Sequence, residues 1–140
     1  MSKPPLVVVD ADAIVAQASP ADNLHIKAVK IAKNLAQINA QVLYPATAIT
    51  EAITHIQRVL GSGAVAYAIA IAFTDPNINV VEINQNTLKH AAQFFSPTTS
   101  KKNTFYDCIV AAVAEEYKAG AVFSFDNFYK KKGLKLAYEL

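Results

Sequence analysis

Short, continuous apolar runs alternate along the chain with longer segments whose apolar residues recur at helical spacing. The short runs span residues 6–9, 42–44, 80–83, 121–123 and 134–136 and predict strands. The first of them is continuous and β-branched, which is typical of a strand covered on both faces. The longer segments predict helices over residues 20–38, 47–60, 64–73, 84–94 and 104–117, and a short helix or turn over 126–132. This alternation predicts an α/β fold: a three-layer α/β/α sandwich with a central, mainly parallel sheet of four to five short strands.

Two of the predicted helices carry distinctive signals. Ser19 and Pro20, with Asp22 three residues after the serine, match an N-cap, a proline at the first helical position and an acid in the first turn. The segment 64–73 is apolar on all sides, so we expect it to be buried on two sides.

Composition limits the possible classes of protein. A chain of 140 residues is long enough for a sizeable core, so we expect one domain over residues 1–140. Hydrophobic residues make up 53% and charged residues 17%, with a formal net charge of +2, which excludes a disordered chain and a basic nucleic-acid tail. Cys108 is the only cysteine, which excludes an internal disulfide and a thiolate metal cage.

The same survey predicts a cytoplasmic location. The N-terminus lacks the charged, then apolar, then small-residue pattern of a signal peptide. The longest apolar stretch, residues 64–73, has ten residues. A membrane span needs about 20, so we expect no membrane segment.

Acidic residues gather where the predicted strands end. Asp10 and Asp12 directly follow the first strand, Glu51 lies one turn into the helix after the second, Asp107 is in the first turn of the helix over 104–117, and Asp126 follows the fourth strand. In a parallel sheet these positions meet at one edge. A divalent cation relieves the repulsion of clustered carboxylates, and oxygen-only ligands favour Mg²⁺ or Mn²⁺. The natural chemistry of such a site is phosphodiester hydrolysis.

The first three of these acids also have structural interpretations. Asp10 can begin a turn after the valine run, and Asp12 suits an N-cap or a group that supports a ligand better than it suits direct ligation. Glu51 lies opposite the apolar stripe of its helix, beside Thr54 and Arg58, as expected of a residue on a solvated face.

The later acids have the same ambiguity. Thr104 and Asp107 match a capping box, so Asp107 can serve only to start its helix. Asn103, however, shares the face of Asp107 with small residues that leave room for a ligand. Asp126 can cap the short helix that follows it, and Ser124 is either a cap or a hydroxyl of the site.

Four segments together resemble the PIN domain family. Residues 7–15 are similar to its opening strand and turn, 50–53 to its glutamate on the helix after the second strand, 104–112 to its third acidic motif, and 121–126 to its strand that ends in a hydroxyl residue and a fourth aspartate. The resemblance covers essentially the whole chain. Single-domain PIN proteins of this length are similar to the VapC toxins of type II toxin-antitoxin pairs.

The resemblance implies a function and partners. Asp10, Glu51, Asp107 and Asp126 would bind Mg²⁺ or Mn²⁺ and catalyse cleavage of single-stranded RNA. A homodimer and a cognate antitoxin that blocks the site would be expected as well. The apolar segment 64–73 is compatible with a dimer face and equally with a helix buried inside the monomer.

Two residues depart from the family pattern. Asp12 stands where asparagine or serine is commoner, which adds negative charge and bears on the number of metal ions. Tyr106 stands where threonine is common, so its phenol either narrows the cleft or stacks on a base.

Basic and aromatic residues near the acids are candidates for binding RNA. Phosphates need cations around an acidic centre, and single strands stack on aromatic rings. The candidates are Arg58, Lys101, Lys102, Lys130 with its neighbours Lys131 and Lys132, Tyr106, Phe128 and Tyr129. Lysine runs are also common on ordinary solvated surfaces. His55, one turn after Glu51, either orients that glutamate or a water, or is a plain surface or core histidine.

Two alternatives to the ribonuclease remain at this point. Asp10 and Asp12 after a hydrophobic strand also resemble the nucleophile motif of haloacid-dehalogenase-like phosphatases, although Ile14 fits that motif poorly. The other alternative is a PIN-like scaffold without catalysis, whose acidic pocket serves only structure or partner binding.

Overall fold

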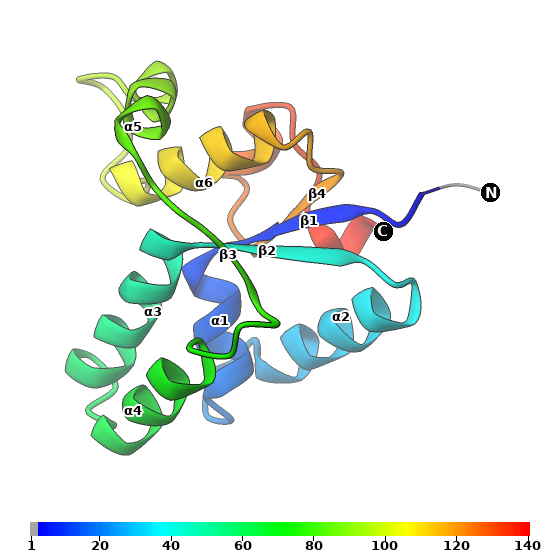
Figure 1. The fold of residues 1–140 in the computed structure, drawn as a ribbon. Helices are drawn as coiled ribbons and strands as arrows, with labels where there is room; N and C mark the ends of the chain where they lie inside the picture. The colour runs from blue at the N-terminus through cyan, green and yellow to red at the C-terminus, as the bar shows by residue number, and fades with distance from the viewer. Residues whose placement is uncertain (1–2) are drawn as a thin grey trace.

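A parallel sheet of four strands forms the middle of the molecule in the computed structural model, which describes residues 3–140 (Figure 1). The strands are β1 (Leu6–Val9), β2 (Gln41–Pro45), β3 (Asn79–Val81) and β4 (Ala121–Phe123). Their order across the sheet is β3-β2-β1-β4, which places β1 in the interior beside both β2 and β4. The predicted parallel sheet is confirmed. The fifth predicted strand is reduced to a single bridge between Leu136 and Val122.

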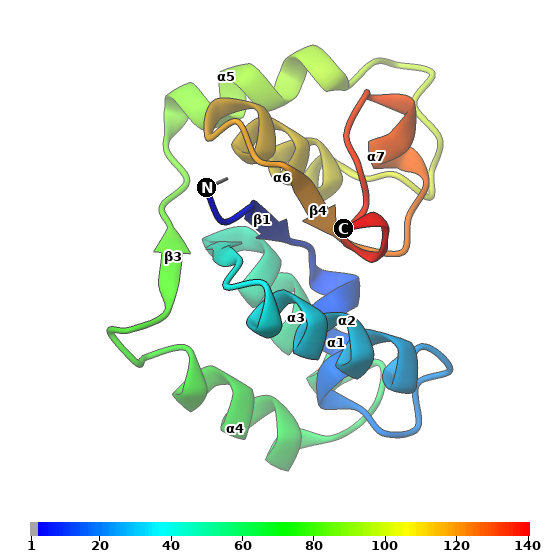
Figure 2. The ribbon, with the colours of Figure 1, turned by 90° about the vertical axis from the view of Figure 1, so that its right-hand side faces the viewer.

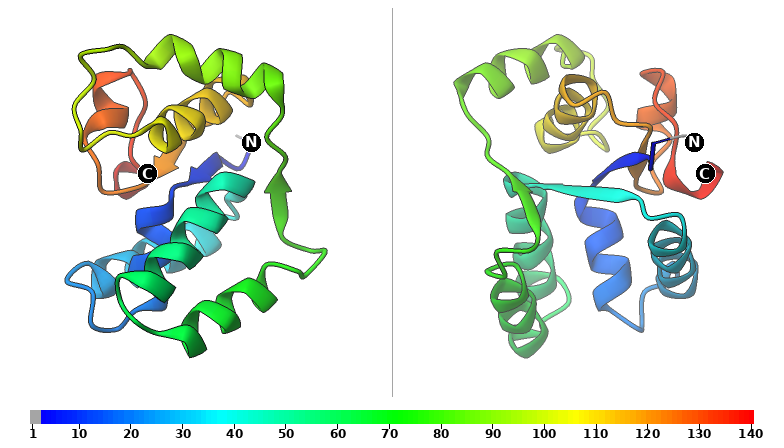
Figure 3. Two further views of the ribbon diagram at one scale, coloured as in Figure 1. Left: turned by 90° about the vertical axis from the view of Figure 1, so that its left-hand side faces the viewer. Right: turned by 45° about the vertical axis from the view of Figure 1, so that its right-hand side comes forward.

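Helices cover both faces of this sheet and complete three layers (Figures 1 and 2). The helices are α1 (Ala11–Ala18), α2 (His25–Gln37), α3 (Ala46–Arg58), α4 (Gly63–Ala72), α5 (Gln85–Ala91), α6 (Phe105–Glu116) and α7 (Phe128–Lys131), with 3-10 turns η1 (Ala92–Phe94) and η2 (Ala137–Glu139). Helices α1 to α4 lie on one side of the sheet, and α5 and α6 lie on the other (Figure 3). Among the helices of residues 3–140, none combines the length and hydropathy that a membrane span requires.

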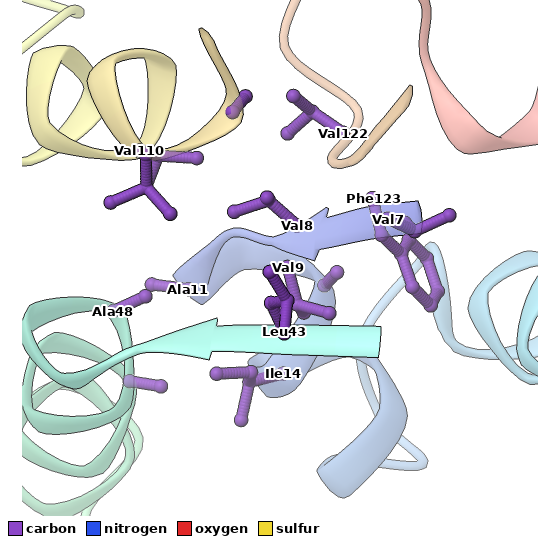
Figure 4. Packing of buried hydrophobic residues seen from close by; sticks show 14 of the residues in the cluster. Val7, Val8, Val9, Ala11, Ile14, Leu43, Ala48, Val110, Val122 and Phe123 are labelled. Atoms are coloured by element: carbon purple, nitrogen blue, oxygen red, sulfur yellow. The ribbon is translucent and has the colours of Figure 1, made fainter. Parts of the chain in front are cut away.

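Strand β1 and helix α6 are both part of the buried core. Val7, Val8 and Val9 have no exposed surface, because β1 is covered on both faces. Val8 points to the side of the sheet on which Val110 of α6 and Val122 lie, while Val9 faces the side of α1 (Figure 4). Burying a side chain of this kind stabilises the fold by about 1.5–3 kcal/mol. This packing holds the end of β1 in place, and with it Asp10, the next residue of the chain.

The first predicted helix is wrong at its start. Residues 20–24 form turns, and α2 begins only at His25. Helix α1 directly follows β1, over residues for which no helix was predicted. The Asp22 amide donates to the Ser19 carbonyl (3.0 Å), and an Asp22 carboxylate oxygen accepts from the Leu24 amide (2.8 Å). The residues that resembled a helix start close a turn instead, because the same side chains cap both structures.

Helix α4 is exposed over most of its surface, contrary to the expectation of burial on two sides. Only Ala66 is buried, and Tyr67 and Ile71 are 69% and 52% exposed. One face of the helix packs on α3, with Val65 and Ile69 against the core, and the residues of the opposite face are exposed (Figure 2). The alternative of a helix buried inside the monomer is therefore wrong.

Candidate active site

Asp10 is buried at the junction of β1 and α1. Its amide donates to the Phe123 carbonyl of β4 (3.0 Å), which ties the residue to the sheet. As the N-cap of α1, its Oδ1 accepts from the Ala11 amide (2.6 Å), and its Oδ2 accepts from the hydroxyl of Tyr129 (2.6 Å). The residue is 4% exposed. Asp10 thus begins a helix, as the structural interpretation held, and also presents a hydrogen-bonded carboxylate at the edge of the sheet.

Asp12 and Ser124 connect the first turn of α1 to the segment after β4. Oδ2 of Asp12 accepts from the Ser124 hydroxyl (2.9 Å) and from the Phe125 amide (2.8 Å). The Ser124 oxygen also lies 3.5 Å from Asp10 Oδ2 and accepts from the Asp126 amide (3.1 Å). Oδ1 of Asp12 is buried and has no hydrogen-bond partner among residues 3–140. A buried carboxylate oxygen without a donor is costly unless a cation or water meets it.

Asn103 joins the two acids contributed by the later part of the chain. Its amide nitrogen donates to Asp126 Oδ2 (2.9 Å) and lies 3.5 Å from Asp107 Oδ2. Thr104 and Asp107 form the predicted capping box, in which Asp107 accepts from the Thr104 amide (3.1 Å). Asp126 also accepts from the Phe128 amide (2.9 Å). The capping roles and the position in the acidic cluster therefore coexist.

Glu51 differs from the other acids because its carboxylate accepts no hydrogen bond within residues 3–140. It is half-buried on α3 and borders two pockets. The first, of about 260 Å³, also includes Asp12 and Asp22. The second, of about 530 Å³, also includes Arg58 and Tyr106. Glu51 therefore faces open space next to the cluster and is not on an ordinary solvated face.

Burial, with a smaller contribution from neighbouring charges, raises the pKa of several of these acids. Burial raises the pKa of Glu51 to about 7, and the charges of Asp107 and Asp12 add to that shift. Burial likewise raises the pKa of Asp107 to about 6, with contributions from Asp126 and Asp12. Burial holds the pKa of Asp10 well above its usual value, with Asp12 adding to the effect. The five carboxylates thus share one region of negative potential.

These residues fit a hard divalent cation that keeps part of its water shell. The donors are carboxylate oxygens, Asp12 Oδ1 is buried without a partner, and a cation would relieve the repulsion that raises the pKa values. Within residues 3–140, no three Asp, Glu, His or Cys side chains already surround a single point. Mg²⁺ is commonly held by only one or two carboxylates, with waters and substrate phosphate completing its ligands.

The PIN domain family model matches residues 7–134, which include all five acids. The chain belongs to the PIN domain family. No curated protein sequence matches it.

Solved structures have the same fold as this PIN domain at low sequence identity. VapC20 of Mycobacterium tuberculosis, a sarcin-ricin loop cleaving toxin, has a TM-score of 0.78 at 17% identity, covering 91% of this chain and 95% of its own. FitAcB from Neisseria gonorrhoeae has a TM-score of 0.68 at 16% identity, covering 96% and 99%. VapBC-1 from nontypeable Haemophilus influenzae has a TM-score of 0.60 at 18% identity, covering 94% and 96%.

The candidate RNA-binding residues of this PIN domain separate into three groups. Arg58 and the exposed Tyr106 line the larger pocket beside Glu51. Lys101 and Lys102 are exposed in the loop before α6. Lys130 bonds to the C-terminal turn instead: its amine lies 3.4 Å from Glu139 and donates to the Tyr138 hydroxyl (3.2 Å).

The prediction that Phe128 and Tyr129 can stack on bases is wrong. Phe128 is 6% exposed and Tyr129 has no exposed surface, because both side chains belong to the hydrophobic core. Neither ring is open to a base. Tyr129 instead contributes its hydroxyl to Asp10, a role that sequence reasoning missed. The available signal was its position three residues after Asp126.

Proposed function

We propose that this PIN domain is an endoribonuclease that uses Mg²⁺ or Mn²⁺ to cleave single-stranded RNA, and that it is the toxin of a toxin-antitoxin pair. The observation that carries the proposal is the cluster of five carboxylates at one edge of the sheet, where burial and neighbouring charges raise the pKa of Asp10, Glu51 and Asp107. Membership of the PIN family supports nuclease chemistry. The fold shared with VapC20 supports an RNA substrate and a toxin role.

Asp10, Glu51, Asp107 and Asp126 would hold the cation, and Asp12 would add charge through its unpartnered Oδ1. When bound, the cation supplies an activated water and offsets charge on the phosphate and leaving oxygen. Two other side chains hold these carboxylates in position. Ser124 fixes Asp12, and Asn103 keeps Asp107 and Asp126 together despite their repulsion.

A cleavage assay tests this function. We expect the purified protein to cut labelled single-stranded RNA with Mg²⁺ or Mn²⁺ and to stop when the cation is chelated. Asp10→Asn should reduce the rate by about 1000-fold, since metal stabilisation of charge is worth several kcal/mol. Glu82→Gln, a change of an exposed glutamate outside the cluster, is the matched control.

Two results would oppose the proposal in different ways. A protein that folds and binds cations but cuts no RNA under any metal would be the scaffold without catalysis. Hydrolysis of a phosphate monoester through Asp10, without RNA cleavage, would match the haloacid-dehalogenase-like alternative, which the PIN family match already disfavours.

The proposal includes a cognate antitoxin, a homodimer and a cytoplasmic location. FitAcB and VapBC-1 share this fold, which supports the antitoxin.

The exposed apolar surface of α4, including Tyr67 and Ile71, supports a dimer face. We expect sedimentation of the purified chain to give a dimer that Ile71→Glu converts to a monomer. A monomer at all concentrations would contradict this part.

A further inference from the structure

The larger pocket beside Glu51 combines the groups that a nucleotide requires. It has a volume of about 530 Å³, within the range of small-ligand sites, and lies between α3 and the start of α6. Its wall holds a cation, Arg58, an aromatic ring, Tyr106, and two hydroxyl groups, Thr50 and Thr54. Glu51 forms one side of it, so the pocket directly adjoins the acidic cluster.

The aromatic ring in this pocket is free to bind. Tyr106 is 44% exposed although it stands at the second position of a helix whose residues from Asp107 to Ala114 are all buried. Its ring packs against no other aromatic ring among residues 3–140, whereas the preceding Phe105 packs edge-on against Phe95. An exposed ring with an open face is suited to stacking on a base.

The arginine in this pocket, Arg58, is also free of ion pairs within residues 3–140. Arg58 is the only arginine in the sequence, and it forms neither of the two ion pairs found in residues 3–140. It lies two helical turns after Glu51 and therefore on the same face of α3. Arginine binds phosphate in a bidentate manner, so its place beside a phosphodiesterase centre suits an RNA backbone.

The smaller pocket on the other side of Glu51 has the opposite character. Asp12, Asp22 and Glu51 contribute carboxylates to it, and its lining includes no lysine or arginine. A polyanion would be repelled there and attracted toward Arg58. Charge therefore distinguishes the two directions in which a strand can leave the acidic cluster.

We propose that the pocket of Arg58, Tyr106, Thr50 and Thr54 is a subsite for the nucleotide next to the scissile phosphate of single-stranded RNA. The base stacks on Tyr106 and its phosphate binds Arg58. This inference rests on the proposed nuclease function, because it takes RNA as the substrate. It adds the direction of the strand: from the carboxylates, across Glu51, toward α6.

Binding of RNA without cleavage tests the subsite. In an Asp10→Asn background with Mg²⁺, the affinity for a labelled single strand of roughly ten nucleotides is measured by fluorescence anisotropy. We expect Tyr106→Leu to weaken binding by about 5-fold to 100-fold and Tyr106→Phe to retain it, since stacking needs only the ring. Tyr117→Leu is the matched control, because Tyr117 is 46% exposed at the other end of α6.

Salt dependence tests the arginine separately. Arg58→Gln should weaken binding and reduce the slope of log Kd against log salt by about 0.7, as expected for one lost phosphate contact on a single strand. Lys33→Gln on α2 is the control for a surface charge outside the pocket. If Tyr106→Leu binds as tightly as Tyr117→Leu, and Arg58→Gln leaves the slope unchanged, the subsite is overturned.

A small substrate separates failure of the subsite from failure of the nuclease. Metal-dependent hydrolysis of bis(4-nitrophenyl) phosphate by the unsubstituted protein reports the chemistry without needing a nucleotide subsite. If hydrolysis occurs but the substitutions at Tyr106 and Arg58 leave the RNA affinity unchanged, only the subsite proposal is wrong. If no hydrolysis occurs but affinity depends on both residues, the subsite stands and the catalytic proposal fails.

Discussion

The acidic cluster has two sides that are built differently. On the β1 side, Asp10 and Asp12 accept hydrogen bonds from Tyr129, Ser124 and backbone amides. On the α3 side, Glu51 accepts none within the described chain and borders two pockets. Both sides carry raised pKa values, mainly because of burial.

The β1 side thus fixes the positions of its carboxylates, whereas the α3 side leaves its carboxylate accessible. Hydrogen bonds on the β1 side fix where the carboxylates point, as a metal site requires of its supporting groups. The α3 side leaves its carboxylate unpaired and next to open space, where a cation, water or phosphate can approach. In the proposed nuclease, the β1 side would hold the metal-binding carboxylates in place and the α3 side would admit the substrate.

The largest effect should follow from weakening the β1 side. Tyr129→Phe removes the hydroxyl that donates to Asp10 and leaves the ring in the core. We expect Mn²⁺ affinity, measured by calorimetric titration, to fall by about 10-fold to 100-fold, as for other groups that orient metal ligands. Stability in urea should fall by about 1–2 kcal/mol, because a buried hydrogen bond to a carboxylate is lost.

The matched control is Tyr138→Phe. That hydroxyl accepts from Lys130 at the surface, so its loss should change neither quantity by a measurable amount. A Tyr129→Phe protein that loses stability but binds Mn²⁺ as before would make Tyr129 a packing residue only.

The sheet was predictable from sequence because its signal is local. Valine runs with no polar interruption identify strands buried on both faces, and the structure confirms the parallel arrangement. The start of the first helix was not predictable, because Ser19, Pro20 and Asp22 fit a turn and a helix start equally well. The exposure of α4 was not predictable either. An apolar helix indicates that its surface should be covered, but its sequence does not say whether the same chain or another one covers it.

The site shows the same division between local and distant information. The positions of Asp10, Asp12 and Asp126 at strand ends follow from the chain order alone. The hydrogen bond from Tyr129 to Asp10 joins residues 119 positions apart and depends on how α7 packs. The metal-binding roles of the acids stay predictions. The exposure of Tyr106 beside Arg58 depends on the approach of α6 to α3, which no local pattern contains.

A smaller effect, on stability, should distinguish the α3 side. Glu51 and Asp107 have folded pKa values of about 7 and about 6, above the usual 4.5 and 3.8, so between about pH 4 and pH 7 the folded protein binds more protons than the unfolded chain. Without divalent cations, the free energy of unfolding should therefore fall as pH rises through that window. Glu51→Gln should raise the melting temperature at about pH 8 by roughly 3–5 °C and change it little at about pH 4, once solvent screening is allowed for.

Added Mn²⁺ sharpens this expectation, because a cation that binds the carboxylates stabilises their charged form. At about pH 8 it should raise the melting temperature of the unsubstituted protein more than that of Glu51→Gln. Glu82→Gln, a change of an exposed glutamate, should follow the unsubstituted protein at every pH. If the melting temperature instead rises between about pH 4 and pH 7 without metal, Glu51 and Asp107 are stabilised as anions in the fold, and the description of Glu51 as an unpaired carboxylate is wrong.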